Sequence, residues 1–195
     1  MTITINRVYD SYWRAEQAVA KLKAVGIPEA DISLVANRHV SAEHDNVSES
    51  SGAASGAGVG AALGGGAGLL AGIGLLAIPG LGPVVAAGWL AATAVGAVGG
   101  AMAGGIVGAL VKAGVSEEDA HVYSESIRRG GTMITVRTSD ANRAAVDGAL
   151  NSMSPVDIAA RRNEYQKTGW TQFDPAAPDY SLSEAEIERA RRREM

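Results

Sequence analysis

Residues 50–111 read SSGAASGAGVGAALGGGAGLLAGIGLLAIPGLGPVVAAGWLAATAVGAVGGAMAGGIVGALV, and this stretch decides which fold the sequence predicts. None of its 62 residues is Asp, Glu, Lys, Arg or His. Small residues recur at every fourth position on both sides of a break rich in proline and glycine. They are Gly52, Gly56, Gly60, Gly64, Gly68 and Gly72 before the break, and Gly88, Ala92, Gly96, Gly100, Gly104 and Gly108 after it. Positions four apart share one face of an α-helix, so each half is predicted to be a helix with a smooth face for packing.

The break between the two halves predicts a tight reversal of the chain. It contains Pro79, Gly80, Gly82 and Pro83, which are residues that end helices and form turns. The sequence therefore predicts a glycine-zipper helical hairpin over residues 52–113, with helices at residues 53–78 and 84–111. Both helices exceed the ~20 residues needed to span the hydrocarbon core of a bilayer. We expect membrane lipid and further copies of the chain as partners.

Two alternatives to insertion stay open, because the first helix is weakly hydrophobic and few basic residues flank the hairpin. In one, glycine-faced hairpins from several copies form the buried core of a soluble homo-oligomer. In the other, the segment is a low-complexity region without fixed structure. The chain has no cysteine, and its first residues do not resemble a secretory signal peptide. We therefore expect a bacterial inner-membrane protein with a cytoplasmic soluble domain, or a wholly cytoplasmic protein.

The flanking sequence predicts an α+β fold. Residues 1–37 suggest a strand with Ile3 and Ile5 on one face, a helix and a second strand, followed by a polar linker over residues 38–51. Residues 114–160 suggest a helix capped by Ser116, a strand, a helix after Asp140 and a last strand at residues 156–160. With the hairpin set aside, this order predicts a ferredoxin-like βαβ–αβαβ sandwich interrupted by a long insertion.

The C-terminal tail, residues 161–195, differs from the rest in composition. Aromatic residues punctuate a proline-containing stretch, and a short charged helix with a capping box is predicted over residues 183–194. Three aromatics in an irregular segment predict anchoring on the sandwich or on a neighbouring chain. They are Trp170, Phe173 and Tyr180.

The sequence offers no set of residues for catalysis. A net charge of −4 gives no basic footprint for nucleic acid. Residues 72–77 match a dinucleotide-binding pattern, but no predicted strand precedes them and no acidic residue follows at the required distance. A polar linker accounts better than a metal site for four clustered residues, His39, Glu43, His44 and Asp45. We predict no enzyme, no cofactor and no metal. A small-molecule sensor, suggested only by analogy of fold, is the second hypothesis.

Three pieces of the sequence carry a resemblance to a family. They are AIPGLGP at residues 77–83, GALVKAGVSEEDA at residues 108–120 and IRRGGTMITV at residues 127–136. Together with the βαβ start, they resemble bacterial general-stress proteins of the heat-induced type, over roughly residues 3–150. The resemblance implies a stress-induced, non-enzymatic protein and supplies no catalytic residues. We predict a structural or interaction protein that acts by assembly.

Overall fold

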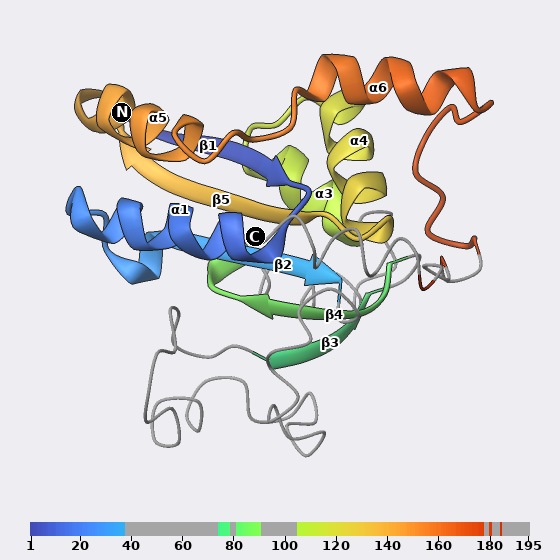
Figure 1. Ribbon diagram of the computed structural model, residues 1–195, viewed down its shortest axis with the longest axis horizontal. Coiled ribbons are helices and arrows are strands. Elements are labelled where there is room, and N and C mark those ends of the chain that lie inside the picture. Colours follow the sequence, from blue (N-terminus) through green and yellow to red (C-terminus); the bar gives the residue numbers. More distant parts are fainter. Residues whose placement is uncertain (38–73, 79–80, 91–104, 178–179, 181–183, 185–195) are drawn as a thin grey trace.

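The computed structural model describes residues 1–37, 74–78, 81–90, 105–177, 180 and 184, and these form an α+β fold, as predicted (Figure 1). The elements in chain order are β1 (Thr2–Tyr9), α1 (Tyr12–Ala24), the 3-10 turn η1 (Glu29–Asp31), β2 (Ile32–Asn37), β3 (Gly74–Ile78), β4 (Gly82–Ala87), α3 (Gly105–Lys112), α4 (Glu117–Arg128), β5 (Thr132–Ser139), the 3-10 turn η4 (Asp140–Asn142), α5 (Arg143–Asn151) and α6 (Ile158–Lys167).

The strands form one five-stranded sheet in the order β1-β5-β2-β4-β3. Every pair of neighbours is antiparallel. Strand β5 lies between β1 and β2, so that Val136 faces Ile5 on one side and Ile32 on the other. Because β1 and β2 run parallel to each other and are joined by α1, they form a split βαβ unit around β5.

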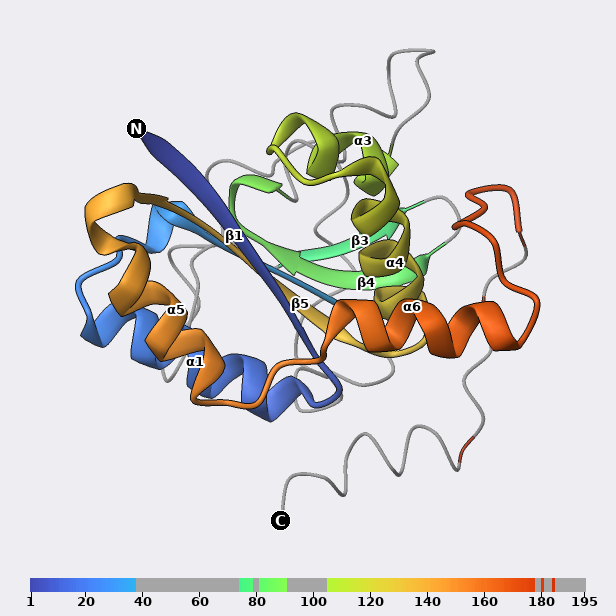
Figure 2. The ribbon, with the colours of Figure 1, turned by 90° about the horizontal axis from the view of Figure 1, so that it is seen from above.

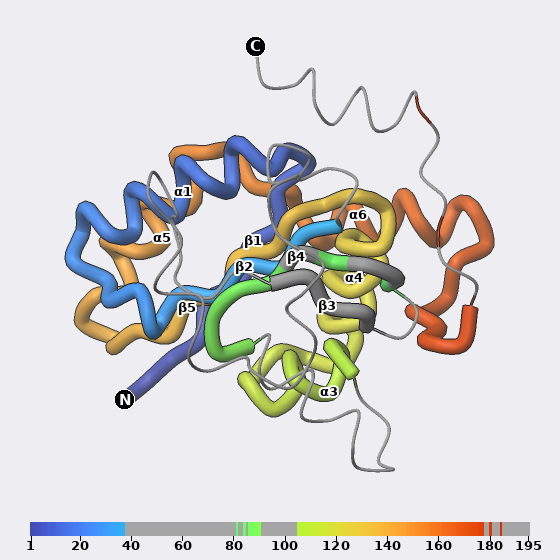
Figure 3. Tube along the Cα trace, turned by 90° about the horizontal axis from the view of Figure 1, so that it is seen from below, coloured from blue at the N-terminus to red at the C-terminus, as the bar shows by residue number. Residues whose placement is uncertain are grey.

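Helices cover both faces of the sheet (Figures 2 and 3). On one face, α1 and α5 pack on a core that includes Leu22, Ile134 and Leu150. On the other face, α3 and α4 pack on a core that includes Leu110 and Met133. The alternation of Met133 and Ile134 between the two cores explains why β5 is buried along most of its length.

The predicted helical hairpin is wrong at its centre, because residues 74–78 and 82–87 are strands. Leu76 pairs with Val84, and Val85 pairs with Ala36 of β2. The predicted turn therefore connects two strands and not two helices. Each glycine in a helix costs about 1 kcal/mol relative to alanine, so a glycine repeat does not by itself make the segment helical. The edge of β2 instead offers backbone hydrogen bonds, and Val84 is fully buried against it.

The predicted last strand, at residues 156–160, is also wrong. Val156 donates one backbone hydrogen bond to the carbonyl of Val8, at 2.7 Å, and α6 then begins. The Asp157 side chain caps this helix by accepting a hydrogen bond from the Ala160 N–H at 3.0 Å. A helix cap and good helix formers thus outweigh the apolar Val156 and Ile158, and the fourth strand of a ferredoxin-like sandwich does not form.

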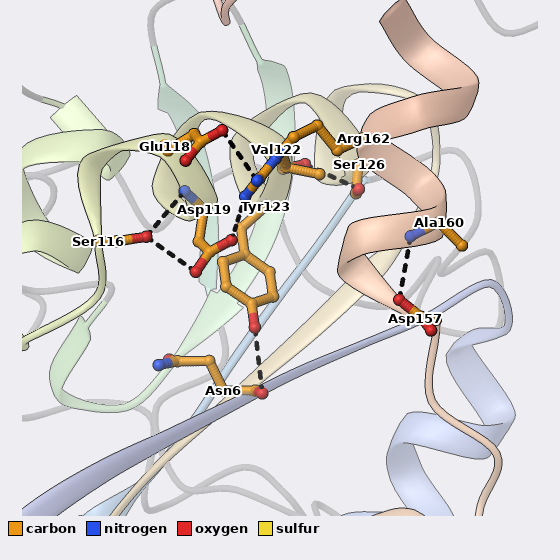
Figure 4. Close-up of polar contacts among 10 residues, drawn as sticks. All are labelled: Asn6, Ser116, Glu118, Asp119, Val122, Tyr123, Ser126, Asp157, Ala160 and Arg162. Atoms are coloured by element: carbon orange, nitrogen blue, oxygen red, sulfur yellow. Dashed lines mark hydrogen bonds and ion pairs between the residues drawn. The ribbon is translucent and has the colours of Figure 1, made fainter.

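Local signals elsewhere predicted the elements correctly. Ser116 caps α4 by accepting a hydrogen bond from the Asp119 N–H at 3.1 Å (Figure 4). Strand β5 and helix α5 follow in the predicted order. The polar linker over residues 38–51 lies outside the described residues, as does the helix predicted over residues 183–194 apart from Glu184.

Candidate functional site

Two consecutive arginines of α6 bind two different elements, the end of β1 and the start of α4, and we call their contacts the α6 junction. The Arg161 Nη2 group donates to both carboxylate oxygens of Asp10, at 2.8 Å each, at the end of β1. Arg162 pairs with Glu118 at 2.9 Å and also with Asp119, at the start of α4 (Figure 4). These ion pairs hold α6 beside β1 and α4.

A cavity of about 410 Å³ lies at the α6 junction, between the N-termini of α1 and α6. Its lining includes two cations and three carboxylates, Arg14, Arg161, Asp10, Asp157 and Glu164. Arg161 pairs with Asp10 and Glu164, and Asp157 caps α6. Within the described part of the chain, Arg14 makes no ion pair. The cavity has the size for a small polar molecule. Ser11 and Ser154 also line it, but no hydrogen bond among the described residues joins either hydroxyl to a carboxylate of the lining, as an activated nucleophile would require.

Arg161 is a fixed positive charge. Burial by itself would lower the pKa of its guanidinium, but hydrogen bonds with Tyr165 and Asp10 and the negative charge of Asp10 raise that pKa above its ordinary value. The group therefore keeps its proton at every ordinary pH, so it stabilises the junction and transfers no proton.

A second charged cluster lies on α4, around a buried carboxylate. Glu125 is 1% exposed, and its carboxylate lies 2.6 Å from Nε of Arg129 and 3.7 Å from Arg128. The Arg129 guanidinium stacks over the Tyr165 ring, 4.4 Å from its centre. The Tyr165 hydroxyl lies within hydrogen-bond distance of Ser126 Oγ, at 3.2 Å. The cluster thus ties α6 to α4 by charge, stacking and hydrogen bonding together.

The three predicted tail anchors contact residues of the same chain. The Trp170 ring packs edge-on against the Tyr165 ring, at 5.5 Å between centres. Phe173 is 3% exposed and belongs to the core under α3 and α4. The Tyr180 ring lies 5.6 Å and 5.7 Å from the guanidinium groups of Arg128 and Arg129.

The structure describes only four of the predicted zipper and turn residues, namely Gly82, Pro83, Gly88 and Gly108. Gly88 follows β4, and Gly108 lies in α3. Gly82 and Pro83 begin β4. The other zipper positions, with Pro79 and Gly80, lie outside the described residues.

The residues that form the charged junctions were not singled out as a site from the sequence. In the sequence, Asp10 lies within the predicted strand–helix–strand of residues 1–37, and Arg161 begins the tail. These two residues are 151 positions apart in the chain, and no local pattern pairs them.

Two buried tyrosines make the stability of the fold depend on pH in the alkaline range. Burial raises the pKa of Tyr123 to about 12, although Arg7 lowers it and Asp119 adds to the rise. Burial also raises the pKa of Tyr9 above its ordinary value. The folded protein thus holds these phenolic protons more tightly than the unfolded chain does. This stabilisation is complete below the ordinary tyrosine pKa of about 10 and is lost as the pH rises towards 12.

We therefore expect the free energy of unfolding to fall between pH 10 and about 12. Urea unfolding at a series of pH values measures this slope, and absorbance at about 295 nm reports phenolate formation. Tyr123→Phe should flatten the slope. An unchanged slope in Tyr123→Phe would assign the alkaline transition to other groups.

Within the described residues, no group of three or more metal-ligating side chains is close enough to hold a metal ion. The clustered residues His39, Glu43, His44 and Asp45 lie outside this part. None of the described helices combines the length and apolar character needed to cross a bilayer. Comparison of the chain with models of protein families, with curated proteins and with solved structures finds no match.

Proposed function

We propose that this protein is a non-enzymatic interaction protein that forms homo-oligomers through its charge-free, glycine-rich segment. The observation that carries the proposal is the absence of any ionisable residue over residues 50–111, together with small residues at every fourth position. Close packing of backbones is what such a pattern favours. The resemblance to general-stress proteins supports a role for this assembly under stress.

The described domain supports the role of a scaffold. Its two cores are closed by helices on both faces of the sheet. Most of its charged clusters are engaged in ion pairs within the chain, as at Asp10, Glu125 and Asp119. A folded unit of this kind is suited to carry an interaction segment.

The position of the strands favours other copies over lipid as the partner. Residues 74–78 and 82–87 belong to the sheet, and Leu90, Ile106 and Leu110 are buried in the domain core. Of the charge-free stretch, this leaves residues 50–73 and 91–104 for a partner. The second of these is 14 residues long (104 − 91 + 1), which is shorter than the ~20 that a spanning helix needs. The first is 24 residues long (73 − 50 + 1), enough for one span, but β2 before it and β3 after it belong to the same sheet, so a single crossing would not return the chain to that sheet.

A substitution in the glycine repeat tests the proposal. Gly64→Leu places a large side chain on the face of small residues, and we expect it to raise the dissociation constant of the oligomer at least tenfold. Ala62→Leu is the matched control, because it adds the same side chain two positions away from the repeat. Light scattering coupled to size-exclusion chromatography measures the mass of each variant.

Equal masses for both variants would contradict assembly through the repeat. Recovery of the wild-type protein from the membrane fraction only after detergent, and not after a carbonate wash, would assign the segment to lipid instead.

A further inference from the structure

Strand β1 has one edge that pairs with β5 and one that faces outward. The outward groups are identified by their partners: the Asn6 carbonyl accepts from the Tyr123 hydroxyl at 3.3 Å, and the Val8 carbonyl accepts from Val156 N–H at 2.7 Å. Backbone groups of successive residues point to opposite sides of a strand. The N–H and C=O groups of Thr2 and Thr4 therefore face outward as well.

This outward edge is uncovered at its N-terminal end. Seen from above, no other described element passes in front of the N-terminal half of β1, whereas the segment leading into α6 passes near its C-terminal end (Figure 2). Among the described residues, none donates or accepts a hydrogen bond at the outward backbone groups of Thr2 and Thr4.

The edge also lacks the usual protection against pairing. Residues 2–6 read Thr-Ile-Thr-Ile-Asn, without a charge or a proline. The register with β5 runs without a bulge from Thr2 opposite Ser139 to Tyr9 opposite Thr132. Natural edge strands are commonly blunted by lysine, proline, bulges or a covering element, because an open edge recruits another strand.

We propose that this edge of β1 pairs antiparallel with the same edge of a second copy of this chain. A second copy fits because the edge is self-complementary and brings no like charges together. The first charged side chain of β1 is Arg7, which is already paired with Asp147 at 2.7 Å. The pairing joins two sheets into one continuous sheet across a two-fold axis.

The occupied Asn6 carbonyl selects the register. A pair centred on Thr4 would place Thr2 opposite Asn6, whose carbonyl already accepts from Tyr123 and Arg7. A pair centred on Ile3 places each Thr2 opposite the Thr4 of the other copy, so all the open groups of both residues are used. The two Ile3 side chains then lie opposite each other, next to the core under α1 and α5.

Cysteine crosslinking tests this register, because the natural chain contains no cysteine. In the register centred on Ile3, the two Ile3 residues form a non-hydrogen-bonded pair with Cα atoms about 4.5 Å apart, within the range of about 4.4–6.8 Å that a disulfide bridges. We expect Ile3→Cys to give a covalent dimer on mild oxidation of the folded protein. Thr4→Cys alone should not, but a mixture of Thr2→Cys and Thr4→Cys should give the mixed dimer.

A proline substitution supplies the matched control. Thr4→Pro removes the outward N–H without removing a bond to β5, and proline is tolerated on such an edge. Added to Ile3→Cys, Thr4→Pro should slow crosslinking at least tenfold, whereas Thr4→Ser should leave its rate unchanged. Circular dichroism verifies that both double variants are folded.

Equal crosslinking rates in the Thr4→Pro and Thr4→Ser backgrounds would overturn the proposal. If Ile3→Cys disturbs folding, the mixture of Thr2→Cys and Thr4→Cys tests the same edge. Failure of that mixture to form the mixed dimer would overturn the proposal. This surface is independent of the glycine repeat, so Gly64→Leu should leave the Ile3→Cys crosslink unchanged. The two assembly proposals therefore fail separately.

Discussion

Replacing Gly88 by alanine is expected to lower the free energy of unfolding by about 3 kcal/mol or more. Gly88 has a φ of +88°, a conformation that side chains disfavour. A Cβ added there would lie 2.3 Å from the carbonyl oxygen of Ile32 and 2.8 Å from the Cα of Ser33. Both are backbone atoms of β2, which pairs with β4 and β5, so neither can move without disturbing the sheet.

Gly26→Ala is the matched control for this substitution. Gly26 has nearly the same φ, +85°, but an added Cβ meets nothing within 4 Å. Gly26→Ala should therefore lower the free energy of unfolding only by the conformational cost of a side chain at positive φ, about 1 kcal/mol. Urea unfolding of the two variants measures the difference. Equal losses would show that the end of β4 does not approach β2 closely in solution.

Replacing Glu125 by alanine is also expected to have a large effect, lowering the free energy of unfolding by about 3 kcal/mol. The carboxylate is 1% exposed and faces the guanidinium groups of Arg128 and Arg129. Removing it leaves two partly buried positive charges near each other, and no other carboxylate of the described residues pairs with either of them. Those arginine side chains are 18% and 28% exposed, so water screens them in part and the loss falls at the lower end of the range for buried pairs.

Glu118→Ala gives the control, since Glu118 also forms an ion pair on α4, with Arg162 at 2.9 Å, but its side chain is 72% exposed. Exposed pairs contribute about 0.5 kcal/mol or less on average. Chemical denaturation at neutral pH compares the two variants. A loss for Glu118→Ala as large as that for Glu125→Ala would contradict the importance of burial at this cluster.

Local chemistry made much of the fold predictable. The Ser116 cap and the alternation of Ile3 and Ile5 marked elements that depend on a few neighbouring residues. The strands at residues 74–87 could not be predicted in this way, because positions four apart share one face of a strand as well as one face of a helix, so the four-residue repeat does not distinguish the two. Their structure depends on the edge of β2, which is distant in sequence.

The contacts of the α6 junction could not be predicted from the sequence for a similar reason. Residues 156–160 are apolar enough to suggest a strand. The hydrogen bond that caps the helix instead is accepted by one side chain, that of Asp157. The ion pair of Arg161 with Asp10 exists only once α6 lies beside the end of β1. Such pairs follow from the fold and leave no local pattern from which to predict them.

The place of β5 between β1 and β2 sets the order in which the chain can fold during synthesis. Pairs such as Ile5 with Val136 join residues 131 positions apart (136 − 5), and β1, whose neighbour in the sheet is β5, cannot pair within the sheet until β5 has been synthesised. Contacts of such long range slow folding. The glycine-rich segment is therefore translated, and exposed to other nascent chains, before the domain that carries it can close.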